Sequence, residues 1–314
     1  MQFRNFEQIG SELSPLEFYA RQVVEGFITG LHKSPYHGFS VEFAEHRQYN
    51  SGESTRHIDW KRYARTERLF VKRYEEETNL RCYLALDCSG SMYYPVHPKF
   101  SWETPNKLQY AALCGVSLMN LMRRQRDAVG LSLFAQGVDT FTPARSTTVH
   151  HRLLIHEMEQ MLHSYTSADA RAGNTAESLH LLAEKIHKRS LVVLFTDVLD
   201  AETDKVDEVF SALQHLKYNG HEVLMFHVMD GAHELNLDFE NRPYRFVDME
   251  SGETIQLNPS EIRSKYAEDQ QQRLRELKLK CAQFGIDLIE ADLAKGFNDV
   301  LISYLLKRQR MRSV

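Results

Sequence analysis

Residues 84–92 of the chain read LALDCSGSM, and the interpretation of the whole sequence starts from this stretch. An apolar run that is typical of a buried strand ends at an aspartate, Asp87, and two serines, Ser89 and Ser91, follow at alternate positions. Because alternate residues of an extended segment point to the same side, these side chains can turn their oxygens toward one point.

From residue 81 onward, short apolar runs alternate with segments of helical periodicity. We expect strands at 82–86, 129–134, 191–196, 222–228 and 286–290, with a return arm after the second strand at GVDTF. We expect helices near 105–125, 148–163, 175–188, 204–218, 260–284 and 297–310. Continuous apolar strands separated by helices predict an α/β fold whose mainly parallel sheet carries helices on both faces.

The sequence predicts two parts. Residues 1–80 hold an N-terminal helix with a capping signal, followed by an extended collar with strand candidates at 40–49 and 68–77. Residues 81–314 form the α/β domain. A hairpin insertion is expected near 243–258, where a Ser-Gly pair separates two alternating runs.

The composition limits the classes of function. The formal net charge of -5 argues against a protein that mainly coats nucleic acid, because phosphate binding needs a basic surface. The four cysteines lack the spacing and density of a secreted disulfide scaffold and indicate a reducing compartment. The start of the sequence lacks an apolar signal core, and no apolar run approaches the roughly 20 residues that span a bilayer. We therefore expect a cytoplasmic protein without a membrane span.

The position of Asp87 favours a binding site. In open α/β sheets, ligands bind beyond the carboxyl ends of the strands, and the strand LVVLFT ends in the same way at Asp197. Carboxylates and hydroxyls are the hard oxygen donors that Mg²⁺ prefers. A serine-rich turn that caps the next helix would give the same short pattern, but two aspartates at strand ends favour a metal site.

The segment DCSGSM resembles the metal-ion-dependent adhesion site of von Willebrand factor A domains, which have a Rossmann-like fold. The resemblance covers roughly residues 80–310. It implies that Ser89 and Ser91 bind Mg²⁺, or Mn²⁺ or Ca²⁺, directly, while Asp87 and Asp197 bind it largely through water. It also implies that an acidic side chain of the ligand completes the coordination.

The same resemblance implies a threonine ligand from a later loop. The candidate is Thr175, although its spacing from the following helix leucines differs from the family pattern. Asn174 and Glu177 have the spacing of a capping box, which would make Thr175 simply the first residue of a helix.

A second signature occupies residues 47–77, RQYNSGESTRHIDWKRYARTERLFVKRYEEE. It closely resembles the R-x-Y-x-x-G-D-x-x-R-x-I-D-W-x-x-x-A-R pattern of the domain-of-unknown-function-58 family, with Glu53 in place of the usual aspartate. The matching positions that we interpret as structural are Arg47, Tyr49, Arg56, Asp59, Trp60 and Arg65. This resemblance covers nearly the whole chain and implies a bacterial protein associated with MoxR-type AAA+ ATPases.

The second signature has two interpretations. Between Arg56 and Arg73, seven Arg and Lys residues are interleaved with aromatic residues, as in a surface that stacks bases and binds phosphates. In the other interpretation, the arginines pair with Asp59 and with glutamates 75–77, and Trp60 packs on the sheet, forming a structural collar. The acidic run that follows and the acidic chain favour the collar, so we expect no nucleic acid as a partner.

Motifs of common enzyme classes are absent from the sequence: it has no G-x-x-x-x-G-K-[ST] loop, no G-x-S-x-G elbow and no H-E-x-x-H motif. The histidines between 150 and 163 lack the cysteine or carboxylate partners of a zinc site. We expect a non-enzymatic, metal-dependent adaptor that binds an acidic side chain of a MoxR-like AAA+ ATPase or of its client protein. The alternative is a metal-dependent phosphoryl hydrolase that uses the strand-end carboxylates.

The collar interpretation makes a prediction about Trp60. Trp60→Ala should lower the free energy of unfolding by ~3–5 kcal/mol, as the loss of a large buried aromatic side chain does. Denaturant unfolding of both proteins measures this difference. An unchanged stability would contradict the collar, and tight, salt-sensitive DNA binding by the unaltered protein would favour the nucleic-acid surface.

Overall fold

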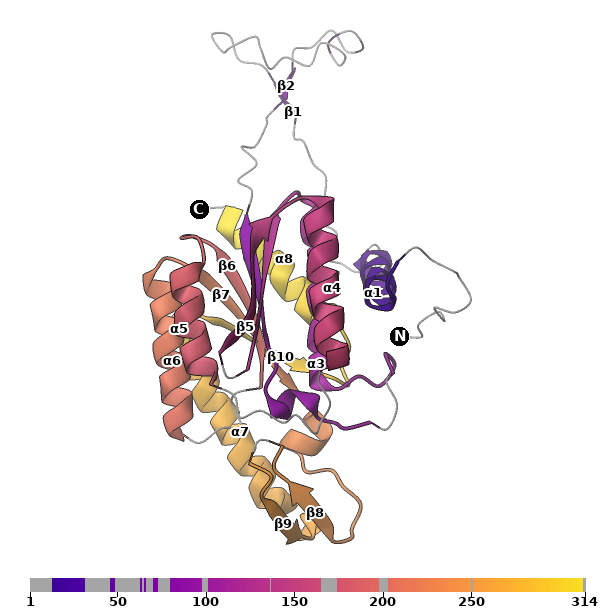
Figure 1. Ribbon diagram of the computed structural model, residues 1–314, viewed down its shortest axis with the longest axis vertical. Coiled ribbons are helices and arrows are strands. Elements are labelled where there is room, and N and C mark those ends of the chain that lie inside the picture. Colours follow the sequence, from indigo (N-terminus) through magenta and orange to yellow (C-terminus); the bar gives the residue numbers. More distant parts are fainter. Residues whose placement is uncertain are drawn as a thin grey trace. The chain divides into compact units, whose positions relative to one another are not determined.

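The main body of the chain is built around a mainly parallel β-sheet, as a computed structural model shows (Figure 1). The structure describes residues 13–31, 46–48, 63, 65, 70–72, 80–97, 101–135, 137–164, 174–197, 203–249 and 251–312. Within these residues the sheet has six strands, in the spatial order β10 (Asp287–Asp292), β7 (Glu222–Met229), β6 (Leu191–Thr196), β3 (Arg81–Asp87), β4 (Ala128–Phe134) and β5 (Val138–Arg145). Neighbouring strands are parallel, except that β5 runs antiparallel to β4.

Helices cover both faces of this sheet (Figure 1). One face carries α5 (Thr175–Lys185), α6 (Thr203–Tyr218) and the C-terminal part of α7 (Pro259–Gln283). The other face carries α3 (Lys107–Arg124), α4 (Thr148–Ser164) and α8 (Asn298–Arg312). The predicted fold class is therefore confirmed, and it is the Rossmann-like arrangement expected of a von Willebrand factor A-like domain.

The central strands read as continuous apolar runs because helices bury them from both sides. Tyr83 and Ala85 of β3 belong to the core beneath α5 and α6, together with Val192 and Leu194 of β6. The intervening residue Leu84 is also fully buried. Because β3, β6 and β7 are neighbouring parallel strands, their carboxyl ends lie at one edge of the sheet, which we call the carboxyl edge.

A capping box fixes the start of α3 at the carboxyl edge. The Asn106 side chain accepts a hydrogen bond from the Gln109 backbone N–H (2.8 Å), and the Gln109 side chain accepts one from the Asn106 N–H (3.0 Å). This reciprocal pair satisfies amides that have no partner within the helix. It makes Lys107 the first residue of α3.

The chain forms two compact units, one of residues 1–29 with 80–314 and one of residues 30–79. The N-terminal helix α1 (Pro15–Leu31) is grouped with the α/β body as far as residue 29, whereas the sequence analysis expected residues 1–80 as one segment.

The apolar face of α1 explains why the helix belongs to the body. Leu16, Val23 and Phe27 are between 0% and 4% exposed. The Leu16 N–H donates to Glu159 of α4 (3.3 Å), and the Ser117 hydroxyl of α3 lies 3.5 Å from the Ala20 carbonyl that it donates to.

In the unit of residues 30–79, β1 (His46–Gln48) pairs antiparallel with β2 (Phe70–Lys72). Each of these strands falls within a predicted strand candidate. Of the signature residues, Arg47 lies in β1 and Arg65 is exposed. The other four, on which the collar interpretation depends, lie outside the described residues: Tyr49, Arg56, Asp59 and Trp60.

The predicted hairpin is present as β8 (Tyr244–Val247) and β9 (Thr254–Leu257), which pair antiparallel. Gly252 in its turn has φ +73°, a conformation that favours glycine. Two short elements were not expected: the 3₁₀ helix η3 (Gly90–Tyr93) after β3, and the π-helical turn η6 (Gly231–Leu235) after β7. None of the helices in the described segments is both long and apolar enough to cross a membrane.

The burial of α1 makes a prediction. Leu16→Ala should lower the free energy of unfolding by ~2–5 kcal/mol, because a fully buried leucine loses its packing and leaves a cavity. The matched control is Leu279→Ala on α7, where the same side chain is 72% exposed and the change should stay within ~0.5 kcal/mol. Denaturant unfolding measures both values, and equal effects would contradict the docking of α1.

Candidate metal site

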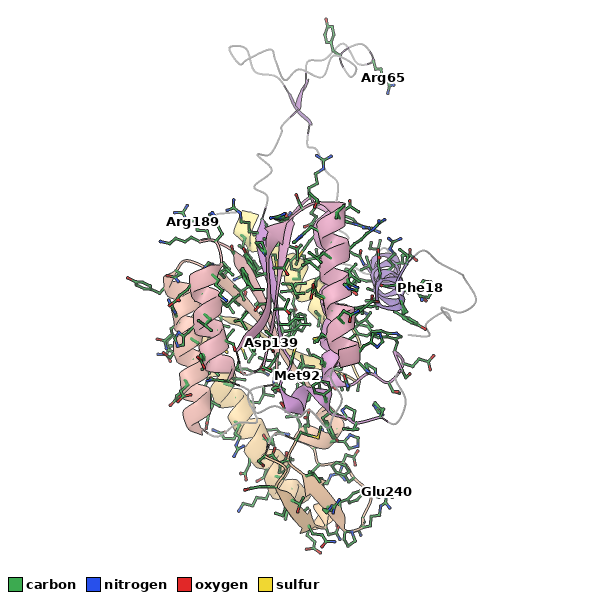
Figure 2. All side chains as sticks on the ribbon, in the orientation of Figure 1. Phe18, Arg65, Met92, Asp139, Arg189 and Glu240 are labelled. Carbon is green, nitrogen blue, oxygen red and sulfur yellow. The ribbon has the colours of Figure 1, made fainter. Side chains whose placement is uncertain are left out.

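The predicted site residues meet at the carboxyl edge of the sheet and come from three separate turns of the chain. Asp87 is the last residue of β3, Ser89 directly precedes η3 and Ser91 lies within η3. Thr175 is the first residue of α5, and Asp197 directly follows β6. Figure 2 marks this edge by Met92 in η3.

The hydroxyls of Ser89 and Ser91, the proposed direct ligands, lie at about the separation of neighbouring metal ligands, and Asp197 lies beside them. Ser89 Oγ and Ser91 Oγ are 3.2 Å apart, and the Ser91 hydroxyl donates to Asp197 Oδ1 at 3.0 Å. In an octahedron with Mg²⁺–oxygen distances of about 2.0–2.1 Å, adjacent ligands are about 2.9 Å apart. The donor set and its spacing therefore fit a hard divalent cation.

Asp87 organises the loops around it. Its Oδ1 accepts the Ser89 backbone N–H at 2.9 Å. Its Oδ2 accepts the hydroxyls of Thr196 (2.7 Å) and Thr175 (3.2 Å). Thr175 thus reaches the site in spite of its unusual spacing in the sequence.

The helix cap before Thr175 forms only in part. The Asn174 side chain accepts the Glu177 N–H (3.2 Å), as a cap does. The Glu177 carboxylate, however, accepts from the Asn174 side-chain amide (2.7 Å), while the Asn174 backbone N–H donates to Ala135 O. The expected reciprocal capping box is therefore incomplete, and the cap does not prevent Thr175 from reaching Asp87.

Burial sets the protonation behaviour of Asp87, which is 1% exposed. Burial, and after it the nearby Asp197 carboxylate, raises the pKa of the Asp87 carboxyl to about 6. The hydrogen bonds from Thr196 and Ser89 act in the opposite direction, because they stabilise the carboxylate.

A lysine that the sequence analysis did not single out completes the site. Lys107 is 1% exposed, and its Nζ lies 2.6 Å from Asp197 Oδ2 and 2.5 Å from Glu234 Oε1. A cation at the first residue of a helix is opposed by the helix dipole. This local conflict was a signal in the sequence that Lys107 has an acidic partner.

Glu234 lies in η6 and uses both carboxylate oxygens. Oε1 accepts from Lys107 Nζ, and Oε2 accepts the Asp230 backbone N–H at 2.6 Å. Burial raises the pKa of Glu234, and Lys107 opposes this shift. His227 of β7 is also buried near Asp197, and burial lowers its pKa to about 4, so its imidazole is neutral at pH 7.

The arrangement is rich in hydroxyls and poor in carboxylates. In the part of the chain that the structure describes, no group of three or more His, Cys, Asp or Glu side chains could hold a metal ion by itself. A metal at this edge would depend on Ser89, Ser91 and Thr175 as well as on the two aspartates. The role of these five residues as metal ligands stays a prediction.

Comparison with known proteins identifies the family. Residues 45–276 match the model of the family described as "Protein of unknown function DUF58". Because this match covers well over half of the sequence, the chain belongs to that family.

Relatives and similar structures are distant. Uncharacterized proteins of Mycobacterium tuberculosis and Mycobacterium bovis are 23% identical over 192 residues, which are 61% of this chain and 58% of theirs. The chain therefore spans a little over half the length of these curated relatives. The conserved hypothetical protein BatB from Bacteroides thetaiotaomicron is 18% identical, with a TM-score of 0.45, over 75% of this chain and 100% of its own. The SpRpn10 VWA domain is 9% identical, with a TM-score of 0.37, over 72% and 94%. Such distant likenesses do not bear on function.

The raised pKa of Asp87 predicts how stability depends on pH when divalent ions are absent. The carboxyl binds its proton more tightly in the folded protein, with a pKa of about 6, than at its ordinary value of 3.8. Its stabilising contribution is therefore complete below pH ~4 and is lost as the pH rises through ~6. Asp87→Asn, which mimics the protonated acid, should remove this loss and stabilise the protein at pH 7.5 by roughly 3 kcal/mol.

Unfolding curves measured between pH 4 and 8 in EDTA test this prediction. Asp269→Asn, which neutralises an exposed carboxylate on α7, is the control and should follow the unaltered protein. A parallel pH profile for Asp87→Asn and the unaltered protein would contradict the assignment.

Proposed function

We propose that this protein is a divalent-cation-dependent protein-binding module that works with a MoxR-type AAA+ ATPase and binds an acidic side chain of that ATPase or of its client. The observation that supports this proposal is the convergence of aspartate and hydroxyl oxygens from β3, η3, α5 and the end of β6 on one edge of the sheet.

In this proposal, Ser89 and Ser91 hold the ion directly, Asp87 and Asp197 hold it largely through water, and Thr175 contributes its hydroxyl. The ion supplies one open coordination position for a carboxylate of the partner. The bound carboxylate would link the two proteins through the ion.

The charges of the site support an acidic ligand. Asp87 and Asp197 together balance a divalent ion, and the hydroxyl ligands add no charge. Lys107 and Glu234 balance each other through their contact of 2.5 Å. An incoming carboxylate is therefore not repelled by the occupied site.

The ATPase partner is inferred from the resemblance to the family, whereas the geometry of the described residues supports only the site. A cytoplasmic location and release of the contact by ATP turnover in the partner belong to the same proposal. A phosphoryl hydrolase at this edge would need a general base or a second metal beside the first. Glu234, a further carboxylate at this edge that lies near Asp197, is already held by Lys107 and by the Asp230 amide.

Metal binding is tested by calorimetric titration with Mn²⁺. Asp87→Ala should abolish binding, because it removes the carboxylate that organises Ser89, Thr175 and Thr196 around the site. The control is Asp269→Ala, which removes an exposed carboxylate from α7 and should leave Mn²⁺ affinity unchanged. Equal affinity of all three proteins would refute the site.

The partnership is tested by co-purification with the MoxR-like ATPase of the same organism. Binding should fall on EDTA treatment and in the double variant Ser89→Ala, Ser91→Ala. If binding to the ATPase is unaffected by EDTA and by the double variant, the ion has no role in this interaction. Magnesium-dependent hydrolysis of a phosphate ester that is lost in Asp87→Ala would contradict the adaptor proposal and indicate a hydrolase.

A further inference from the structure

We infer that Lys107 is an internal competitor of the divalent ion: the ammonium and the ion compete for Asp197, and ion binding displaces Lys107 from Asp197 toward Glu234. The inference rests on the proposed metal site and adds to it the residue that controls its occupancy.

Lys107 contacts two buried carboxylates. The ammonium donates a hydrogen bond to Glu234 Oε1 at 2.5 Å. It also forms an ion pair with Asp197 Oδ2 at 2.6 Å. Asp197 is the carboxylate that Lys107 shares with the proposed ion site, because its other oxygen accepts from Ser91.

Asp197 faces both cations with one carboxylate. Its Oδ1 accepts from Ser91, on the side where the ion is proposed, and its Oδ2 faces Lys107. The side chain of Asp197 is 2% exposed, so water screens little of the repulsion between an ammonium and a divalent ion on the same carboxylate. Occupancy of one position therefore weakens the other.

Lys107 cannot move into water, because its side chain is 1% exposed. Its existing contact with Glu234 keeps the buried ammonium paired when the ion takes Asp197. The exchange also reaches beyond the site, because Glu234 Oε2 accepts the Asp230 N–H at the start of η6. A Glu234 carboxylate that neutralises the whole ammonium is a weaker acceptor for this amide.

From η6, contacts continue to the β8–β9 hairpin. His233 Nδ1 lies 2.7 Å from Asp230 Oδ2, and its ring contacts Phe239. Phe239 in turn packs on Tyr244 and Phe246 of β8. Figure 2 shows Glu240, next to Phe239 in the sequence, close to this hairpin. The competition therefore links ion occupancy to the segment that follows β7.

The test is a titration with Mn²⁺ of the full chain and three variants. Lys107→Met should bind Mn²⁺ at least about tenfold more tightly than the unaltered protein, a gain of about 1.4 kcal/mol. Lys107→Met combined with Glu234→Gln removes one positive and one negative charge, so the net charge of the site is that of the unaltered protein. It should also bind more tightly, because Asp197 is free of the ammonium. Lys107→Arg keeps the cation and should show no gain.

Each outcome of the titration decides a separate point. A gain in Lys107→Met that disappears in the double variant would mean that only net charge matters, and would overturn the competition. Mn²⁺ binding by the unaltered protein with no gain in either variant would overturn this inference alone. Absence of Mn²⁺ binding from every protein would overturn the proposed function and this inference together. If Lys107→Met does not fold, because Glu234 and Asp197 are left without a cation, the double variant carries the test.

A second measurement needs no substitution. In the unaltered protein, saturating Mg²⁺ should speed hydrogen exchange of the Asp230 amide, since its acceptor Glu234 is then fully engaged by Lys107. Calorimetry that detects ion binding without a change at this amide would overturn the movement of Lys107.

Discussion

The structure depends on the burial of two aspartates, Asp87 and Asp197, at the ends of neighbouring parallel strands. Each is at most 3% exposed, and two like charges in such a place repel and are poorly solvated. The surrounding turns supply what water would otherwise supply: the Ser89 amide and the hydroxyls of Thr175 and Thr196 bond to Asp87, and Lys107 neutralises Asp197. The starts of η3, α5 and α3 are therefore positioned by the need to stabilise the two buried carboxylates.

The sheet and most helices could be predicted because their signals are local. The strand expected at 191–196 is observed at those residues, since a buried parallel strand reads as an unbroken apolar run. The grouping of α1 with the body, by contrast, depends on contacts with α3 and α4, which are distant in the sequence. The π-helical turn at Gly231–Leu235 depends on Asp230 and Glu234 bonding to nearby backbone amides, and no periodicity marks such a turn.

For the site too, residues with a local sequence signal could be predicted from their spacing, whereas residues from distant segments could not. Asp87, Ser89 and Ser91 share one turn, so their spacing alone indicated convergence. Thr175 comes from another loop, and spacing within its helix says little about its distance from Asp87, which is 3.2 Å. Lys107 was missed because a lysine is ordinarily assigned to the surface. Its position against the helix dipole was the one local inconsistency that pointed to a functional contact.

If the proposed metal site is correct, the neighbouring Lys107 sets a requirement on the charge of the ion. The ammonium is tethered to the protein, so it holds Asp197 without losing the translational freedom that a free ion loses. A monovalent ion offers the same charge and loses that freedom, and it gains little by replacing Lys107. A divalent ion doubles the attraction to the carboxylates, and the hydroxyls of Ser89 and Ser91 suit its demand for hard oxygen ligands. Under the proposed competition, Lys107 would stay inside the protein on Glu234, so the arriving ion would add its full charge to the carboxyl edge. The edge would then attract a carboxylate only when the ion is present, and recognition of an acidic partner would depend on the metal.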